Sequence, residues 1–413
     1  MPTNIPVGSP LARKLFSVAA FAETQRRPSM RKNLTGPAPK QGNAESKLKG
    51  QTSPDYPIVQ IRDLSVGAGD NASIDLFNIV TGLPNMGDQK IAGRLMDLTF
   101  SSMDIKIDQY RAGVDTGGRM AQKRTVHDLR SISKANLAGY GARLEDQLTQ
   151  VHLAGARGFE SGIDWAVPLE THSEFGDVVV NEVLPPSRNR YMVPGSATDV
   201  TDLGTTDFIT LETIDMIRSI MDEDVFPLQP IRLMNGKGEM DPAADDAPLY
   251  MLQMTSRQWY HFNQQTSPND WRTFVANAHA RSQGWNHPLF LGDCGMWNGI
   301  LIKKLNRAVR FPAGKAVRAY DANGNIVNKT AAVDTDRALL MGAQALAEAY
   351  GNHGKSGHYA NWHEEWTDHE NRMEISMAFM GGKKKVRFKR QDTNEMTDHG
   401  VFAIDSYSPD PKA

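Results

Sequence analysis

The 413-residue sequence has one cysteine, no long apolar run and almost no net charge. Because Cys294 is alone, an intramolecular disulfide and a thiolate metal cluster are both excluded. No run approaches the roughly 18 apolar residues that span a bilayer, which predicts a soluble chain with no membrane partner. The net charge of −2 argues against a dedicated nucleic-acid binder, since such proteins carry a basic excess. Residues 13–22 (RKLFSVAAFA) imitate a secretory signal, but their apolar run is short, so a short amphipathic helix is the preferred interpretation.

The first 66 residues are predicted to form an N-terminal arm. Prolines at positions 37, 39, 54 and 57 cannot donate backbone hydrogen bonds, and periodic apolar residues are almost absent. Over residues 1–50, nine basic residues stand against two acidic ones, so this stretch carries +7 and the remainder carries −9. The asymmetry is typical of an arm that lies on a neighbour's acidic surface or contacts nucleic acid, although a solvated terminus has the same composition.

Residues 67–122 are predicted to form a long β-arm. A strand at Ile58–Ile61 precedes it, and Ser73–Val80, Leu95–Phe100 and Met103–Ile107 have strand-like composition or alternation. The arm is mostly polar and has little core of its own. It therefore gains stability only by lying on another surface.

A very long helix is predicted over residues 125–154. Thr125 with Asp128 forms a candidate capping box, apolar residues follow at spacings of three to five, and Gly155 supplies a stop. A helix of about 29 residues at ~1.5 Å rise is about 43 Å long, whereas the average helix has about 11–12 residues. Gly139 and Gly141 are expected to mark a bend.

The rest of the chain has a mixed α/β pattern. Helices are predicted at 210–222 and 336–350, and a hairpin turn at Asp321–Asn325. Strands are predicted at 177–184, at 249–254, twice within 298–311, and at 375–380, 385–388 and 401–404.

Two segments resemble enzyme motifs. Ala349–Ser356 fits a relaxed phosphate-loop pattern, but that chemistry needs a loop between a strand and a helix, and here the predicted helix comes first. The histidines between His353 and His369 form an acidic, His-rich cluster that could hold zinc in a metal-dependent hydrolase, although His363 and His369 lack the usual spacing of four. An exposed loop anchored by Trp362 and Trp366 is the plainer interpretation of that cluster.

Residues 383–390 hold six basic residues in eight. They could contact phosphate. Because Val386 and Phe388 alternate with basic residues, a strand with one charged, solvated face is the preferred interpretation.

The order of these parts resembles the major capsid protein of tailed double-stranded DNA phages, in particular the N-four-like family. The resemblance covers the chain from about residue 58 to the end. It is carried by the segments 107–111 (IDQYR), 117–120 (GGRM), 143–148 (RLEDQL), 338–345 (ALLMGAQA), 381–384 (GGKK) and 400–405 (GVFAID).

The resemblance implies an α+β chain with the Hong Kong 97-type capsid fold shared by tailed phages and herpesviruses. Its expected parts are an N-terminal arm (1–66), an extended β-loop (67–122), a peripheral domain with the spine helix (123–205), an axial domain (206–364) and C-terminal strands (365–413). The chain would have no enzymatic activity and no cofactor or metal.

The implied function is self-assembly into pentamers and hexamers of an icosahedral shell that encloses double-stranded DNA without reading its sequence. The shell would form in the host cytoplasm and become the virion capsid, with scaffolding, portal and decoration proteins as partners. The scaffolding protein is expected to be separate, since a fused one needs about a hundred further residues. Charged residues are expected to make contacts between subunits: Arg26, Arg27, Arg31, Asp88, Lys90, Arg94, Arg111 and Arg119.

Overall fold

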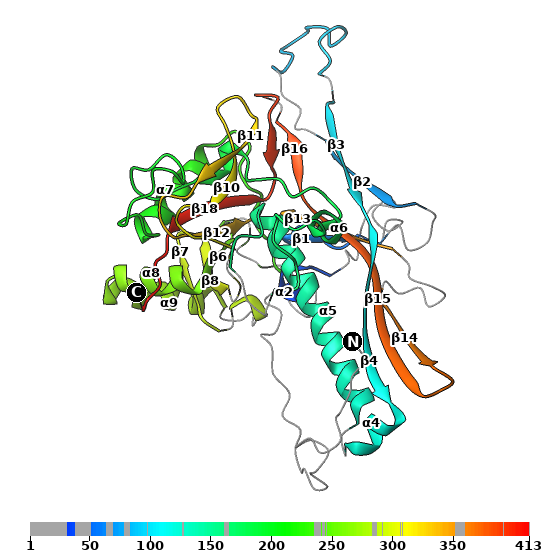
Figure 1. Ribbon diagram of the computed structural model, residues 1–413. Helices are drawn as coiled ribbons and strands as arrows, with labels where there is room; N and C mark the ends of the chain where they lie inside the picture. Colours follow the sequence, from blue (N-terminus) through cyan, green and yellow to red (C-terminus); the bar gives the residue numbers. More distant parts are fainter. Residues whose placement is uncertain are drawn as a thin grey trace.

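The computed structural model has two large β-sheets joined by one long helix, with a β-hairpin projecting from the junction (Figure 1). Helices and strands both occur, as predicted for the α+β class. No helix among the described residues is long and apolar enough to cross a membrane. The described residues are 31–37, 51–62, 69–77, 83–96, 98–125, 128–160, 165–234, 241, 244, 246–282, 287–290, 292–305, 307, 309–351, 360–390 and 392–412.

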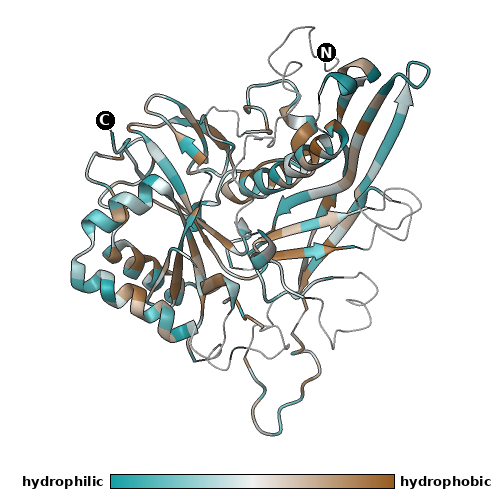
Figure 2. Cartoon of the chain, turned by 90° about the horizontal axis from the view of Figure 1, so that it is seen from below, coloured by the Kyte–Doolittle hydropathy of each residue, from teal (hydrophilic) through white to brown (hydrophobic). Residues whose placement is uncertain are grey.

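A seven-stranded sheet forms the first layer. Its strands, in spatial order, are β5 (Tyr191–Met192), β18 (Val401–Tyr407), β12 (Thr335–Met341), β6 (Tyr250–Thr255), β8 (Ile300–Leu305) and β7 (Cys294–Trp297), with β9 (Val309–Phe311) also on β12. Its central strands are buried on both faces, so alternate residues enter different cores. One face packs under three helices: α7 (Leu211–Glu223), α8 (Ser256–Gln265) and α9 (Pro268–Ser282). Hydrophilic residues cover the outer faces of the helices near the C-terminus (Figure 2).

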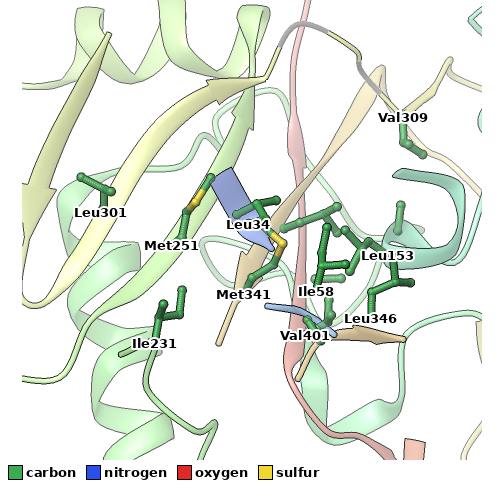
Figure 3. Packing of buried hydrophobic residues seen from close by; sticks show 14 of the residues in the cluster. Leu34, Ile58, Leu153, Ile231, Met251, Leu301, Val309, Met341, Leu346 and Val401 are labelled. Carbon is green, nitrogen blue, oxygen red and sulfur yellow. The ribbon is translucent and has the colours of Figure 1, made fainter. Parts of the chain in front are cut away.

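The opposite face of this sheet meets the rest of the molecule. Met251, Leu339 and Met341 pack there against Leu153 from the long helix and Leu34 from the N-terminal segment. Figure 3 shows Leu34, Met251, Met341 and Leu153, which come to this core from elements far apart in the sequence. This core fixes the seven-stranded sheet to the long helix.

A five-stranded sheet forms the second layer. It contains β1 (Ile58–Ile61), β13 (Leu346–Tyr350), β15 (Arg372–Lys385), β14 (Ala360–Thr367) and β4 (Asp108–Gly118). β15 is the organising strand, since it pairs with β13, β14 and β4. The long helix α5 (Leu129–Ala154) packs on one face of this sheet through two apolar clusters.

The projecting hairpin consists of β2 (Asn71–Phe77) and β3 (Phe100–Lys106). Its inner face, which includes Ala72 and Ile105, packs on Ala347, Val386 and Phe388. β4, which was expected within the extended arm, instead pairs with β15 in the body. The remaining elements are α2 (Arg31–Leu34), α4 (Arg119–Arg124), α6 (Phe175–Val179), η2 (Arg188–Arg190), η3 (Pro288–Phe290) and the hairpins β10 (Ala316–Tyr320) with β11 (Ile326–Thr330) and β16 (Arg387–Lys389) with β17 (Met396–Asp398).

The long helix is confirmed, with a different start. Asp128, and not Thr125, is the N-cap, because its carboxylate accepts hydrogen bonds from the backbone N–H groups of Arg130 and Ser131. Gly155 ends the helix in the left-handed conformation (φ 68°), as predicted. Residues 146–154 are all buried, so this last part of the helix is buried on every side and is not amphipathic.

The helix predicted at 336–350 is wrong. This run forms two strands, β12 and β13, separated by a turn in which Gln344 has φ 55°. Every residue of both strands is buried, so the run is apolar on all faces and its periodicity does not separate a strand from a helix.

Two predicted strands are also wrong. Residues 177–184 contribute to the short helix α6, whose Val178 and Val179 pack in the core beside α5. Of Leu95–Phe100, only Phe100 belongs to a strand. The other predicted strands, the 210–222 helix and the Asp321–Asn325 turn are confirmed within a few residues, while positions 78–80 lie outside the described residues.

Two glycines provide a matched test of this packing. A Cβ on Gly382 would collide with the backbone oxygen of Lys106, where β3 crosses β15, whereas a Cβ on Gly139 would meet nothing within 4 Å. We expect Gly382→Ala to lower the free energy of unfolding by about 1–3 kcal/mol. Gly139→Ala should raise it by about 0.5–1 kcal/mol, because alanine favours the helix. Denaturant unfolding of the unassembled chain measures both, and equal effects would contradict this packing.

Candidate assembly surfaces and the charge network beneath them

The connection between β2 and β3 exposes an unusual amount of apolar surface. We call residues 83–96 with Leu98 the apolar loop. Large apolar side chains here and at the loop's base are between 43% and 90% exposed: Phe77, Leu83, Met86, Ile91, Leu95, Met96, Leu98 and Phe100. Such a concentration marks an interaction surface.

Three predicted contact residues lie in the apolar loop. Asp88, Lys90 and Arg94 are all exposed, and the Arg94 guanidinium donates a hydrogen bond to the Gln89 side chain. The structure therefore brings these charges together with the exposed apolar side chains.

The other predicted contact residues are dispersed. Arg111 is exposed on β4. Arg119 starts α4, and its Nε donates to the Glu370 carbonyl at 3.0 Å. Arg26 and Arg27 lie outside the described residues.

Arg31 is engaged within its own chain. Its Nε and Nη2 donate to the two carboxylate oxygens of Glu348 at 2.9 and 2.7 Å, and its Nη1 donates to Glu145 at 2.9 Å. Two parallel bonds to one carboxylate make the strongest geometry available to an arginine. Arg31 thus fastens α2 to β13 and to the long helix.

Glu348 is the centre of a buried charge network. Its side chain is fully buried, and it also accepts hydrogen bonds from Lys383, from Gln60 Nε2 at 3.0 Å and from the Tyr350 hydroxyl at 2.9 Å. Burial alone would raise the pKa of the Glu348 carboxyl, but Lys383 and Arg31 hold that pKa well below its ordinary value. Glu348 is therefore a buried anion that two cations neutralise.

A second buried carboxylate organises the end of β15. Asp398 accepts hydrogen bonds from Lys385 Nζ at 2.8 Å, from the Arg387 guanidinium and from the Ser187 backbone N–H at 3.1 Å. Burial would raise its pKa, yet the two cations hold the pKa of Asp398 below its usual range.

The solvated basic face predicted at 383–390 is therefore wrong. Lys383, Lys385 and Arg387 point into the body and pair with buried acids, because alternate residues of an extended chain share one face. The acids that pair with them are distant in sequence. A lone acid such as Glu348 inside the apolar run 345–350 was the available signal, since an acid is rarely buried without a partner.

The phosphate-loop interpretation has a different context from the one predicted. Its first residues, Ala349 and Tyr350, end strand β13, so a strand precedes the motif where a helix was predicted. The next described element is β14, another strand, whereas a phosphate loop leads into a helix. Residues 352–359 lie outside the described part of the chain.

The histidine cluster is spread along an exposed hairpin. His363 lies on β14 and His369 in the turn that follows it. Within the described residues, no group of three His, Cys, Asp or Glu side chains is placed to hold a metal ion. His353 and His358 lie outside those residues.

The fold is similar to that of phage capsid proteins. The chain is 30% identical over 353 residues to the major capsid protein of Pseudomonas phage KPP25, covering 81% of this chain and 83% of that one. It is similar to the capsid of Ralstonia phage GP4, with a TM-score of 0.74, 26% identity, and coverage of 100% of this chain and 99% of that one. The capsid asymmetric unit of cyanophage Pam1 shares the fold, with a TM-score of 0.62, 18% identity and 98% of both chains covered.

A family model described as phage capsid protein matches residues 4–410. This chain therefore belongs to the phage capsid protein family, and its fold is of the Hong Kong 97 type, as the sequence resemblance implied. That family has a structural role in the virion shell.

Removing the Glu348 charge tests the network. We expect Glu348→Gln to lower the free energy of unfolding by about 3–5 kcal/mol, because Arg31 and Lys383 lose their buried counter-charge. The control Glu365→Gln changes an acid that is 64% exposed and should cost under about 1 kcal/mol.

The same carboxyl predicts a pH dependence. Because its folded-state pKa is depressed, its stabilisation is complete above the unfolded pKa of about 4.3 and is lost as the pH falls toward the folded value. Unfolding measured from pH 7 downward should therefore show a smaller loss of stability in Glu348→Gln than in the unaltered chain. Identical slopes would contradict the assignment.

Proposed function

We propose that this chain is the major capsid protein of a tailed double-stranded DNA phage, and that it assembles as pentamers and hexamers into an icosahedral shell. Membership in the phage capsid family and the similarity to the GP4 capsid support this proposal. The single observation that carries it further is the apolar loop, whose exposed side chains need the surface of another subunit.

The apolar loop is proposed to dock on a neighbouring copy. Its base is anchored, because the inner face of the β2–β3 hairpin packs on Ala347 and Phe388. Beyond Phe77 and Phe100, which are paired across the hairpin, the apolar side chains enter no core formed by the described residues. Asp88, Lys90 and Arg94 would then orient the contact, since charges fix register and exclude wrong partners.

We propose the same division of the chain into arm, β-loop, domains and C-terminal strands that the sequence resemblance implied, with one change. The arm (1–66), peripheral domain (123–205), axial domain (206–364) and C-terminal strands (365–413) are retained. Within 67–122, the projecting part is proposed to be 71–106, because β4 pairs with β15.

The wider setting follows from the same family. We propose scaffolding, portal and decoration proteins as partners, assembly in the host cytoplasm, and contact with enclosed DNA that is independent of its sequence. The net charge of −2 supports the last point, since a strongly basic wall would bind DNA tightly.

Shortening the loop tests the docking. Phe77 and Phe100 are cross-strand partners, so a two-residue Asn-Gly turn can replace residues 78–99 without changing the register. We expect this variant to keep the unfolding midpoint of the parent while losing shell formation, measured by sedimentation and electron microscopy.

The control shortens another hairpin in the same way. Tyr320 and Ile326 are also paired, so Asn-Gly can replace residues 321–325 while removing no large apolar side chain. This control should assemble. Shells formed normally by the 78–99 replacement would refute the docking role of the apolar loop.

A further inference from the structure

A groove runs beside the base of the β2–β3 hairpin. It consists of two adjoining cavities of about 380 and 330 Å³, which we call the basal groove. The cavities share five lining residues: Pro54, Leu76, Phe77, Gln344 and Phe388. The groove lies beside the end of the hairpin from which the apolar loop begins, and Phe77 borders both surfaces.

The groove follows an open strand edge. Five consecutive residues of β2, Ser73 to Phe77, line the smaller cavity. Successive side chains of a strand point to opposite faces, so consecutive lining residues mean that the cavity runs along the edge of β2 and not along one face. Within the described part of the chain β2 pairs only with β3, so its other edge offers backbone N–H and C=O groups to the groove.

The walls of the groove are apolar and form pockets. Phe388 and Val386 lie on one side, with Pro54, Pro227 and Pro230 around them. Phe77 and Val225 at the groove are 63% and 70% exposed. An open strand edge beside apolar pockets is the geometry by which proteins bind an extended peptide as an added strand.

The charges around the groove favour an acidic occupant. Arg190 and Arg390 both pair with Asp224 at 3.0 Å, and Arg390 also pairs with Asp392 at 2.7 Å, so these four charges balance. Asp398 is outnumbered by Lys385 and Arg387. Lys389 adds an exposed positive charge at the rim. Asp55 and Asp75 offset these two positive charges, and Arg232, which is exposed and also lines the groove, leaves an excess of one positive charge.

We propose that the basal groove binds an extended segment of a second protein, one that alternates apolar and acidic residues, by adding it as a strand to the open edge of β2. The apolar side chains enter the cavities near Phe388, and the acidic ones face Lys389. Every contact that the segment needs is present in one copy of this chain, so binding does not depend on shell geometry.

The test uses two fluorescent heptapeptides, one alternating valine and glutamate and one alternating valine and lysine, added to the full-length chain. Fluorescence anisotropy should show binding of the glutamate peptide only. Hydrogen exchange of the backbone amides in Asn71–Phe77 should slow when that peptide is present.

Two groove variants and two matched controls locate the binding. Val225→Asp and Lys389→Glu should each lower the affinity for the glutamate peptide by about tenfold, because both substitutions make the charge at the groove more negative. Ile326→Asp and Lys123→Glu make the same chemical changes on exposed residues of β11 and α4 and should have no effect.

Three results would overturn the proposal: no binding of the glutamate peptide, equal binding of both peptides, or binding that the two groove variants leave unchanged. A fourth result would also contradict the proposal, because it would show a different occupant. Slow exchange of Asn71–Phe77 in shells formed from this chain alone, with no peptide, would mean that a second copy fills the groove. Failure of shell assembly would bear on the proposed function and leave the peptide measurement intact.

Discussion

The buried carboxylate of Glu348 is the constraint on which the rest of the structure depends. It collects side chains from α2, β1, β13 and β15, and Arg31 of α2 lies 317 positions from Glu348 in the sequence. A buried anion without partners would cost several kcal/mol, so these segments are stable only when they are all in place. The N-terminal segment, the long helix and the five-stranded sheet therefore form one body.

Two features of this chain depart locally from the usual distribution of polarity, in which charges lie outside and apolar side chains inside. Inside, acids and cations are paired, as at Glu348 and at Arg337 with Asp405, where the two bonds measure 2.7 and 2.6 Å. Outside, the apolar loop leaves aliphatic side chains in solvent. Both features suit a subunit that assembles. The buried ion pairs make the body rigid, so that it presents its contact surface in one orientation, and the exposed apolar surface is the part that another copy would cover.

The sequence predicted the parts with local signals. The Gly155 stop, the Asp321–Asn325 turn and the alternation around Met103 marked a helix end and two hairpins, because each depends on nearby residues. The segment 336–350 was misjudged because β12 and β13 are buried on all faces, which removes the period-two pattern. The charge network could not be predicted, because Arg31, Glu348 and Lys383 meet only through tertiary folding. The exposed position of Asp88, Lys90 and Arg94 could be predicted from the sequence, because these residues fall between two predicted strands.

Electron cryomicroscopy of particles assembled from the full-length chain tests the central claim most directly, which is that a body fixed by Glu348 uses the apolar loop to join its neighbours. The account predicts closed shells of pentamers and hexamers, in which Arg31 stays on Glu348 of its own copy and the side chains of Leu83, Met86 and Leu95 lie buried on an adjacent copy. Shells in which these three side chains face solvent would contradict it.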